Sequence, residues 1–293
     1  METLWNDFRN AFRKYDNGLV QLILINLSVF VFFKLMFVFM WLFGAADIYT
    51  KISYWFMLPA SILKLAEKPW TLITYFFFHE GLFHVVFNML FLWWFGQIIH
   101  EFIGNRRLIA LYILGGLAGG IFFILMYNVI PQFSPLVRSN VLLGASGSVY
   151  AIVIGAATLS PNYQFNLILL GPVKIIYIAL FYVLISFFEI AGSNPGGNLA
   201  HLGGSIMGYL FITQLRKGND LGKLVNQAFA WLGSIFTPGP VLKKTKGNGK
   251  TKSKAMLPED EEIDFILDKI SRSGYDSLSS EEKQKLFQAS QKK

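Results

Sequence analysis

Long apolar stretches alternate with short polar ones along the chain, and they set the predicted architecture. A helix needs about 20 residues to cross roughly 30 Å of hydrocarbon. Six stretches reach or approach that length, at approximately 19–42, 82–100, 108–130, 144–160, 168–188 and 199–215. The pattern therefore predicts an all-α, multi-pass membrane protein with six spans.

The fourth and sixth stretches are short and rich in Gly, Ala and Ser. Small residues let helix backbones approach closely within a membrane. We therefore expect these two helices inside the bundle. The long loop at 45–78 carries the aromatic run Tyr54–Met57, which favours partial embedding at the membrane surface.

The residues that follow the sixth span change character. The stretch 221–237 is apolar but interrupted, which favours an amphipathic helix at the interface. Lys243–Lys254 is typical of a flexible basic linker, and Ser279–Glu282 forms a capping-box pattern near the C-terminus. The predicted parts are a cytosolic segment 1–17, a membrane domain 18–217, an interfacial helix with linker 218–258, and a small cytosolic helical appendix 259–293.

Composition and charge support this picture. The 293 residues are 54% hydrophobic, 16% aromatic and only 15% charged, too few charges to cover a soluble domain of this length. The net charge of +8 could indicate a nucleic-acid partner, but most of it follows residue 215. There it can orient the protein, so we expect both termini in the cytoplasm, the bilayer as partner and no nucleic acid. The expected location is a bacterial cytoplasmic membrane.

The absence of cysteine excludes a disulfide framework, a thiolate nucleophile and a Cys-type zinc site. Polar side chains at span depth are costly and indicate function. Ser146 is flanked by Gly144 and Gly147 at the start of the fourth span. A serine there has unpaired backbone N–H groups beside it, which could stabilise an oxyanion if a base takes the hydroxyl proton. The simpler interpretation is a helix cap.

The sixth span offers a base. His201 precedes Gly204 and Gly208, which lie on nearly the same helix face and permit close packing. If this stripe meets the Gly147 face of the fourth span, His201 comes within reach of Ser146. A single intramembrane histidine otherwise serves more often as a packing hydrogen bond.

Two further polar residues lie on the second span. His84 and Asn88 share a helix face and could donate to the oxyanion of a tetrahedral intermediate, or could form an interhelical hydrogen-bond pair. His79 and His84 resemble a zinc-binding pair, but on a regular helix this spacing places them about 140° apart, so we expect no metal. We expect no cofactor either, and the lack of paired carboxylates in the spans disfavours an aspartyl protease.

Together these motifs resemble the rhomboid family of intramembrane serine proteases over roughly residues 70–215. The resemblance rests on His79-x4-His84-x3-Asn88, on Gly144-x-Ser146-Gly147-x-Val149-Tyr150, and on Ala200-His201-x2-Gly204-x3-Gly208. It implies a six-helix rhomboid-like bundle with a Ser146–His201 dyad and an oxyanion hole that includes His84 and Asn88.

The resemblance implies roles for other residues as well. Tyr150 would pack against the His201 ring, His79 would order the first loop, and residues 189–198 would form a mobile cap. The implied activity is serine-type endopeptidase cleavage of single-span membrane proteins near the outer face of the bilayer. The alternatives are a catalytically silent rhomboid-like protein that binds membrane clients and a transporter, although the sequence lacks the inverted repeats typical of transporters.

Overall fold

The computed structural model describes residues 17–167, 171–236, 263, 265–270, 278–279, 281–283 and 285–286. The chain divides into two compact units, Met1–Gly239 and Pro240–Lys293. The predicted N-terminal segment, except for Asn17, and the basic linker Lys243–Lys254 lie outside the described residues.

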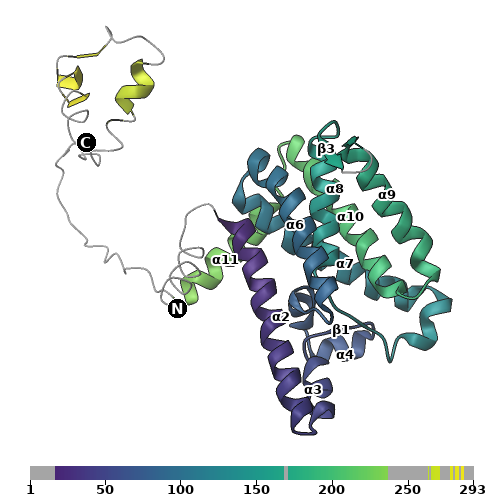
Figure 1. The fold of residues 1–293 in the computed structure, drawn as a ribbon. Helices are drawn as coiled ribbons and strands as arrows, with labels where there is room; N and C mark the ends of the chain where they lie inside the picture. The colour runs from purple at the N-terminus through teal and green to yellow at the C-terminus, as the bar shows by residue number, and fades with distance from the viewer. Residues whose placement is uncertain are drawn as a thin grey trace. The chain divides into compact units, whose positions relative to one another are not determined.

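The first unit is a helical bundle in which one helix corresponds to each predicted span (Figure 1). These helices are α2 (Gly18–Leu42), α6 (Leu82–Ile103), α7 (Asn105–Val129), α8 (Ser146–Leu159), α9 (Ile175–Phe188) and α10 (Pro195–Arg216). Among the described residues, α2, α6 and α7 are long and apolar enough to cross a membrane, while α8 and α9 are apolar but shorter. The all-α membrane class is confirmed, and the count of six crossings stays a prediction.

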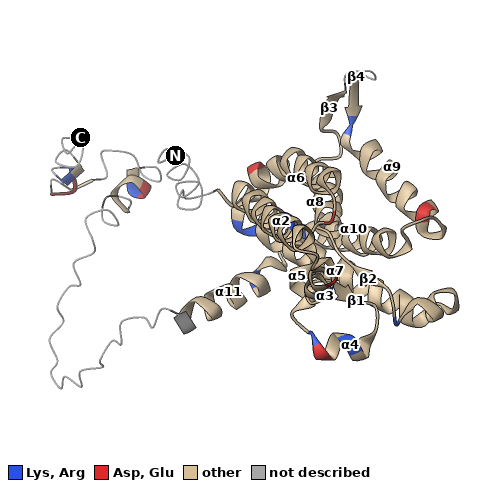
Figure 2. Cartoon of the chain, turned by 60° about the horizontal axis from the view of Figure 1, so that its bottom comes forward, with Lys and Arg blue, Asp and Glu red and all other residues tan. Residues whose placement is uncertain are grey.

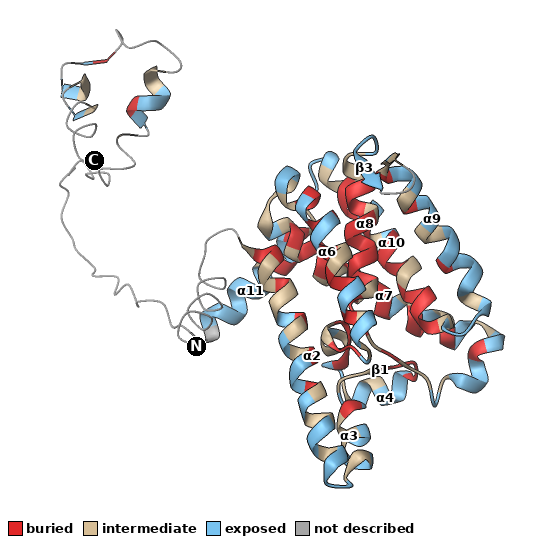
Figure 3. Ribbon diagram, in the orientation of Figure 1, coloured by how far each residue is buried: buried red, intermediate tan, exposed pale blue. Residues whose placement is uncertain are grey.

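Helix α8 forms the centre of the bundle, as its small residues predict. Nearly its whole length is buried between α6, α7 and α10 (Figure 3). Helix α10 is buried along its glycine face, but Ile206 and Tyr209 on its other face are exposed. The expectation of an interior position is therefore confirmed for α8 and holds for only one face of α10.

Glycine contacts join α8 to α10. A Cβ atom on Gly204 would overlap the backbone of Gly147, and one on Gly208 would overlap the backbone of Ala151. The two helices therefore meet through backbone atoms along the stripe that the sequence predicts.

The loop at 45–78 is largely folded. It contains α3 (Ala46–Ser53), β1 (Leu58–Pro59), α4 (Ile62–Glu67), α5 (Thr71–Thr74) and the 3-10 helix η1 (Tyr75–Phe77). Trp70 stacks on Trp55 at 5.7 Å between ring centroids and donates its indole N–H to the Trp55 carbonyl at 2.8 Å. Strand β1 pairs antiparallel with β2 (Val141–Leu142), so the loop is joined to the segment that precedes α8. Another 3-10 helix, η2 (Pro131–Leu136), follows α7.

The predicted start of the fifth span, residue 168, is wrong. Strands β3 (Gln164–Leu167) and β4 (Gly171–Lys174) pair antiparallel, and α9 begins only at Ile175. The apolar run is interrupted by Gly171, which has a φ of +68°, and by Pro172, which lacks the N–H that a helix interior needs. Apolar content alone did not reveal this break.

The sixth helix begins earlier than predicted, at Pro195 rather than residue 199. The Asn194 side chain accepts a hydrogen bond from the Gly197 N–H at 3.0 Å, and proline suits the first helical turn. The Asn198 amide also donates to the Glu189 carbonyl at 2.7 Å, next to the 3-10 helix η3 (Glu189–Ala191). Part of the expected cap at 189–198 is therefore helix.

Charged residues are sparse along the bundle and gather near helix ends and in loops (Figure 2). Lys34, inside α2, is the exception, and its ammonium lies 5.8 Å from the Phe30 ring centroid and 5.6 Å from that of Phe37. After α10, Arg107 and Asp220 form an ion pair at 2.9 Å. It joins the start of α7 to the turn before α11 (Gly222–Phe236).

The predicted interfacial segment is indeed helical. Val225 of α11 is buried, whereas Leu224, Phe229 and Trp231 are exposed. Exposed large apolar side chains on one short helix suit a membrane interface. That location stays a prediction.

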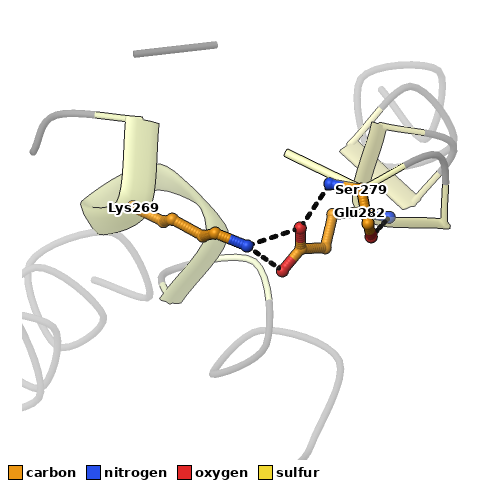
Figure 4. Close-up of polar contacts among 3 residues, drawn as sticks. All are labelled: Lys269, Ser279 and Glu282. Carbon is orange, nitrogen blue, oxygen red and sulfur yellow. Dashed lines mark hydrogen bonds and ion pairs between the residues drawn. The ribbon is translucent and has the colours of Figure 1, made fainter. Parts of the chain in front are cut away.

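The second unit contains the predicted capping box. The Glu282 carboxylate accepts from the Ser279 N–H at 2.7 Å, and the Glu282 N–H donates to the Ser279 hydroxyl at 3.3 Å (Figure 4). Lys269 donates to both oxygens of the same carboxylate. These hydrogen bonds, the one from Lys269 above all, lower the pKa of Glu282. The capping prediction is confirmed.

Candidate active site

Ser146 is the first residue of α8, and the turn before it needs glycine. Gly144 has a φ of +112°, a region that side-chain-bearing residues rarely adopt. A Cβ atom there would also lie 2.7 Å from two atoms of the His84 ring. The Gly144 N–H donates to the Tyr75 carbonyl at 2.9 Å. This turn brings the chain into α8 with the Ser146 hydroxyl facing the bundle interior.

His201 of α10 lies against this hydroxyl. Its Nε2 atom is 2.8 Å from the Ser146 Oγ, which is hydrogen-bond distance between a nucleophile and a general base. The contact arises because Gly204, one turn further along α10, packs on the backbone of Gly147. The structure thus brings together the two residues that the sequence singled out for chemistry.

Tyr150, on the same helix as Ser146, covers the His201 ring. The two rings stack with centroids 4.1 Å apart and planes 7° apart. Such a stack restricts rotation of the imidazole. The position agrees with what the family resemblance implies.

Sequence reasoning missed Ser186 on α9. Its hydroxyl lies 3.1 Å from His201 Nδ1 and donates to the Tyr150 hydroxyl at 2.8 Å. The signal was present, because Ser186 is the one small polar residue between Ile175 and Phe188. No histidine or motif marks the fifth span, so the sequence pattern alone gives this serine no functional context.

His84 and Asn88 line the same cavity as Ser146 and His201, which has a volume of about 630 Å³. The Asn88 amide donates to the His84 carbonyl at 3.0 Å. A carboxamide has two N–H groups, so the second can donate to another acceptor. The remaining wall is mainly apolar and aromatic, and includes Phe83, Phe87, Phe91, Val149, Val153 and Tyr182.

His79 does not lie on a helix, because α6 begins at Leu82. The premise of a regular helix between His79 and His84 is therefore wrong, and their ring centroids lie 5.2 Å apart. His79 Nε2 accepts from the Ala145 N–H at 3.4 Å, and Nδ1 lies 3.3 Å from the Phe77 carbonyl oxygen. With both nitrogens engaged, His79 joins the end of the first loop to the turn before Ser146.

The fold and site define a helical integral membrane protein with a serine and a histidine in contact inside the bundle. Residues 66–218 match the family model of the Rhomboid domain. Because this match covers more than half of the 293 residues, the chain belongs to the rhomboid family. Residues 254–292 match a second model, described only as a family of unknown function (DUF6576).

Several curated proteins are similar to this chain. RHOMBOID-like protein 12, mitochondrial, of Arabidopsis thaliana is 32% identical over 158 residues, which cover 50% of this chain and 47% of that protein. Rhomboid-like protein 16, chloroplastic, of the same plant is 33% identical over 160 residues, covering 50% and 49%. Rhomboid protease GlpG of Pectobacterium atrosepticum is 25% identical over 186 residues, covering 64% and 60%.

The chain thus spans about half the length of the two plant relatives. The names of these two proteins place them in mitochondria and chloroplasts, while GlpG is from a bacterium. The comparisons support a membrane protein but do not support the bacterial cytoplasmic membrane that we expected from the sequence.

Proposed function

We propose that this chain is an intramembrane serine endopeptidase with Ser146 as nucleophile and His201 as general base. The observation that carries the proposal is the 2.8 Å contact between Ser146 Oγ and His201 Nε2 at the wall of a cavity. A serine hydroxyl becomes a useful nucleophile only when a base can take its proton. The family includes a relative named as a protease, GlpG.

In the acylation step, Ser146 Oγ attacks the carbonyl carbon of a peptide bond while His201 Nε2 takes the hydroxyl proton. The negative oxygen of the tetrahedral intermediate is stabilised by the Ser146 N–H, the free N–H of Asn88 and the His84 ring. The C–N bond then breaks, and His201 returns the proton to the leaving amine. This leaves an ester between Ser146 and the substrate.

In the second step, water attacks the ester carbonyl and His201 takes its proton. The intermediate collapses, the acid product leaves and Ser146 recovers its hydrogen. The cavity is large enough for an extended peptide segment together with water. We propose single-span membrane proteins as substrates, cut where small or helix-breaking residues let the helix unwind.

The test is cleavage of a fluorogenic single-span substrate by the purified chain in liposomes. We expect Ser146→Ala to lower kcat by about 10⁴-fold or more. Ser148→Ala is the matched control, since Ser148 lies on the same turn but is fully buried and outside the cavity lining. Undiminished cleavage by Ser146→Ala would refute the proposal.

A fluorophosphonate that reacts with activated serines separates the protease from a silent client-binding protein. We expect one labelled residue, Ser146, and loss of the label in His201→Ala. An intact, folded chain that binds a single-span protein but takes up no label would favour the silent alternative.

A further inference from the structure

Both ring nitrogens of His201 have a hydroxyl partner, and each partner comes from a different helix. Nε2 faces Ser146 of α8 at 2.8 Å, and Nδ1 faces Ser186 of α9 at 3.1 Å. Ser186 is itself 1% exposed. A buried hydroxyl is costly to leave without a hydrogen-bond partner. Its two partners here are the His201 ring and the Tyr150 hydroxyl.

One set of proton positions satisfies these contacts and also suits the proposed reaction. A serine hydroxyl has one proton and can also accept. Ser186 donates that proton to the Tyr150 oxygen at 2.8 Å, so its lone pair can accept the N–H at His201 Nδ1. A proton on Nδ1 leaves Nε2 as the acceptor, which is the state that must receive the proton of Ser146.

The position of Ser186 on α9 supports a specific role. Its neighbours Ile185 and Phe187 are exposed, at 43% and 58%, while Ile175, Ala179 and Ser186 form the buried face of the helix. A serine among otherwise apolar residues places one polar group against His201. Within the described residues of α8, α9 and α10 there is no Asp or Glu that could take this position.

We infer that Ser186 is a positioning residue, which holds His201 in the tautomer with Nδ1 protonated and Nε2 facing Ser146. This inference rests on the proposed protease function. Ser186 takes the place that the carboxylate has in a Ser-His-Asp triad: it orients the imidazole and stabilises the imidazolium that forms when Ser146 loses its proton. Tyr150 contributes twice, by stacking on the ring and by accepting from Ser186.

The first test compares Ser186→Ala with Ser205→Ala in the liposome cleavage assay. Ser205 is a matched control because it is also a buried serine, and its hydroxyl donates to the His201 carbonyl at 2.8 Å rather than to the ring. We expect Ser186→Ala to lower kcat about tenfold and to leave KM unchanged. A tenfold loss corresponds to about 1.4 kcal/mol, which is typical of one lost hydrogen bond. Ser205→Ala should keep the wild-type kcat.

The second test asks whether the hydroxyl itself is needed. Ser186→Thr keeps a hydroxyl at this position, so we expect its kcat to return toward the wild-type value. In a double-mutant cycle with Tyr150→Phe, the loss for the double mutant should be smaller than the product of the two single losses, because both changes break the same chain of hydrogen bonds.

Three results would overturn the inference: an unchanged kcat in Ser186→Ala, an equal loss in Ser205→Ala, or a rise in KM alone. Each result is compared with the cleavage rates of wild type and of the inactive Ser146→Ala variant in the same assay. If wild type does not cleave at all, the proposed function has failed instead. The two failures are therefore distinguishable.

Discussion

A polar side chain inside a membrane helix can be partly satisfied and still serve a reaction, and Asn88 is an example. One N–H of its amide is bonded to the carbonyl one turn earlier, at 3.0 Å, which removes part of the cost of burial. The other N–H can face the cavity that Ser146 and His201 also line. The same side chain is thus anchored by its own helix and available to a substrate.

We expect Asn88→Ala to lower kcat by about 10²- to 10³-fold, because one oxyanion donor is lost. Asn128→Ala is the control: its amide donates to the Ile124 carbonyl one turn earlier and to the Ala60 carbonyl, each at 2.8 Å, but it does not line the cavity. Cleavage rates in liposomes at saturating substrate measure the effect. Equal losses in the two variants would mean that Asn88 contributes to folding and not to catalysis.

At the scale of the element, the crossing of α8 and α10 controls the distance between nucleophile and base. The Ser146 side chain is short, so the two backbones must lie in contact for its hydroxyl to meet the His201 ring. Gly204 and Gly208 permit this contact with Gly147 and Ala151. The distance between Ser146 and His201 therefore depends on glycines elsewhere on the two helices, because glycine has no side chain to hold the backbones apart.

We expect Gly204→Ala to force the two helices apart, because its Cβ would overlap the Gly147 carbonyl. Overpacking of this kind costs about 1–3 kcal/mol, and a wider separation also weakens the contact between His201 and Ser146. Thermal unfolding in detergent and cleavage in liposomes measure the two effects. Both the melting temperature and kcat should fall.

Gly233→Ala on α11 is the control, since a Cβ there meets nothing within 4 Å. Alanine favours a helix over glycine by about 0.5–1 kcal/mol, so this variant should be as stable as wild type or more so. A Gly204→Ala chain that melts and cleaves like Gly233→Ala would contradict the proposed role of the crossing.

At the scale of the whole molecule, the chain has two compact units, and all residues that line the cavity belong to the first, Met1–Gly239. The second unit has its own ion pair and helix cap, formed by Lys269, Ser279 and Glu282. The first unit therefore contains every residue that we propose takes part in the reaction.

We therefore expect a chain that ends at Gly239 to cleave the fluorogenic substrate with kcat and KM within about twofold of the full chain, since no proposed catalytic contact is removed. A chain that ends at Lys217 loses α11 and the Arg107–Asp220 ion pair as well, so it should unfold at a lower temperature. Loss of cleavage by the chain that ends at Gly239 would assign the second unit a direct part in the reaction.

The sequence by itself determined the features that depend on local pattern. Apolar run length located each of the six helices, and the capping box at Ser279 and Glu282 was recognisable because both its partners lie within one helical turn. The spacing of Gly204 and Gly208 also indicated the face on which His201 would meet Ser146, because helical periodicity places residues on a face without reference to other segments.

Only the tertiary structure decided which distant groups meet. The pairing of β1 with β2, the turn of His79 toward Ala145 and the hydrogen bond of Ser186 with His201 join segments well separated along the chain. The hairpin of β3 and β4 was hidden because apolar residues suit a strand as well as a helix. Hydrophobic pattern selects the elements, but the partner of a buried hydroxyl or imidazole is decided by how the helices pack.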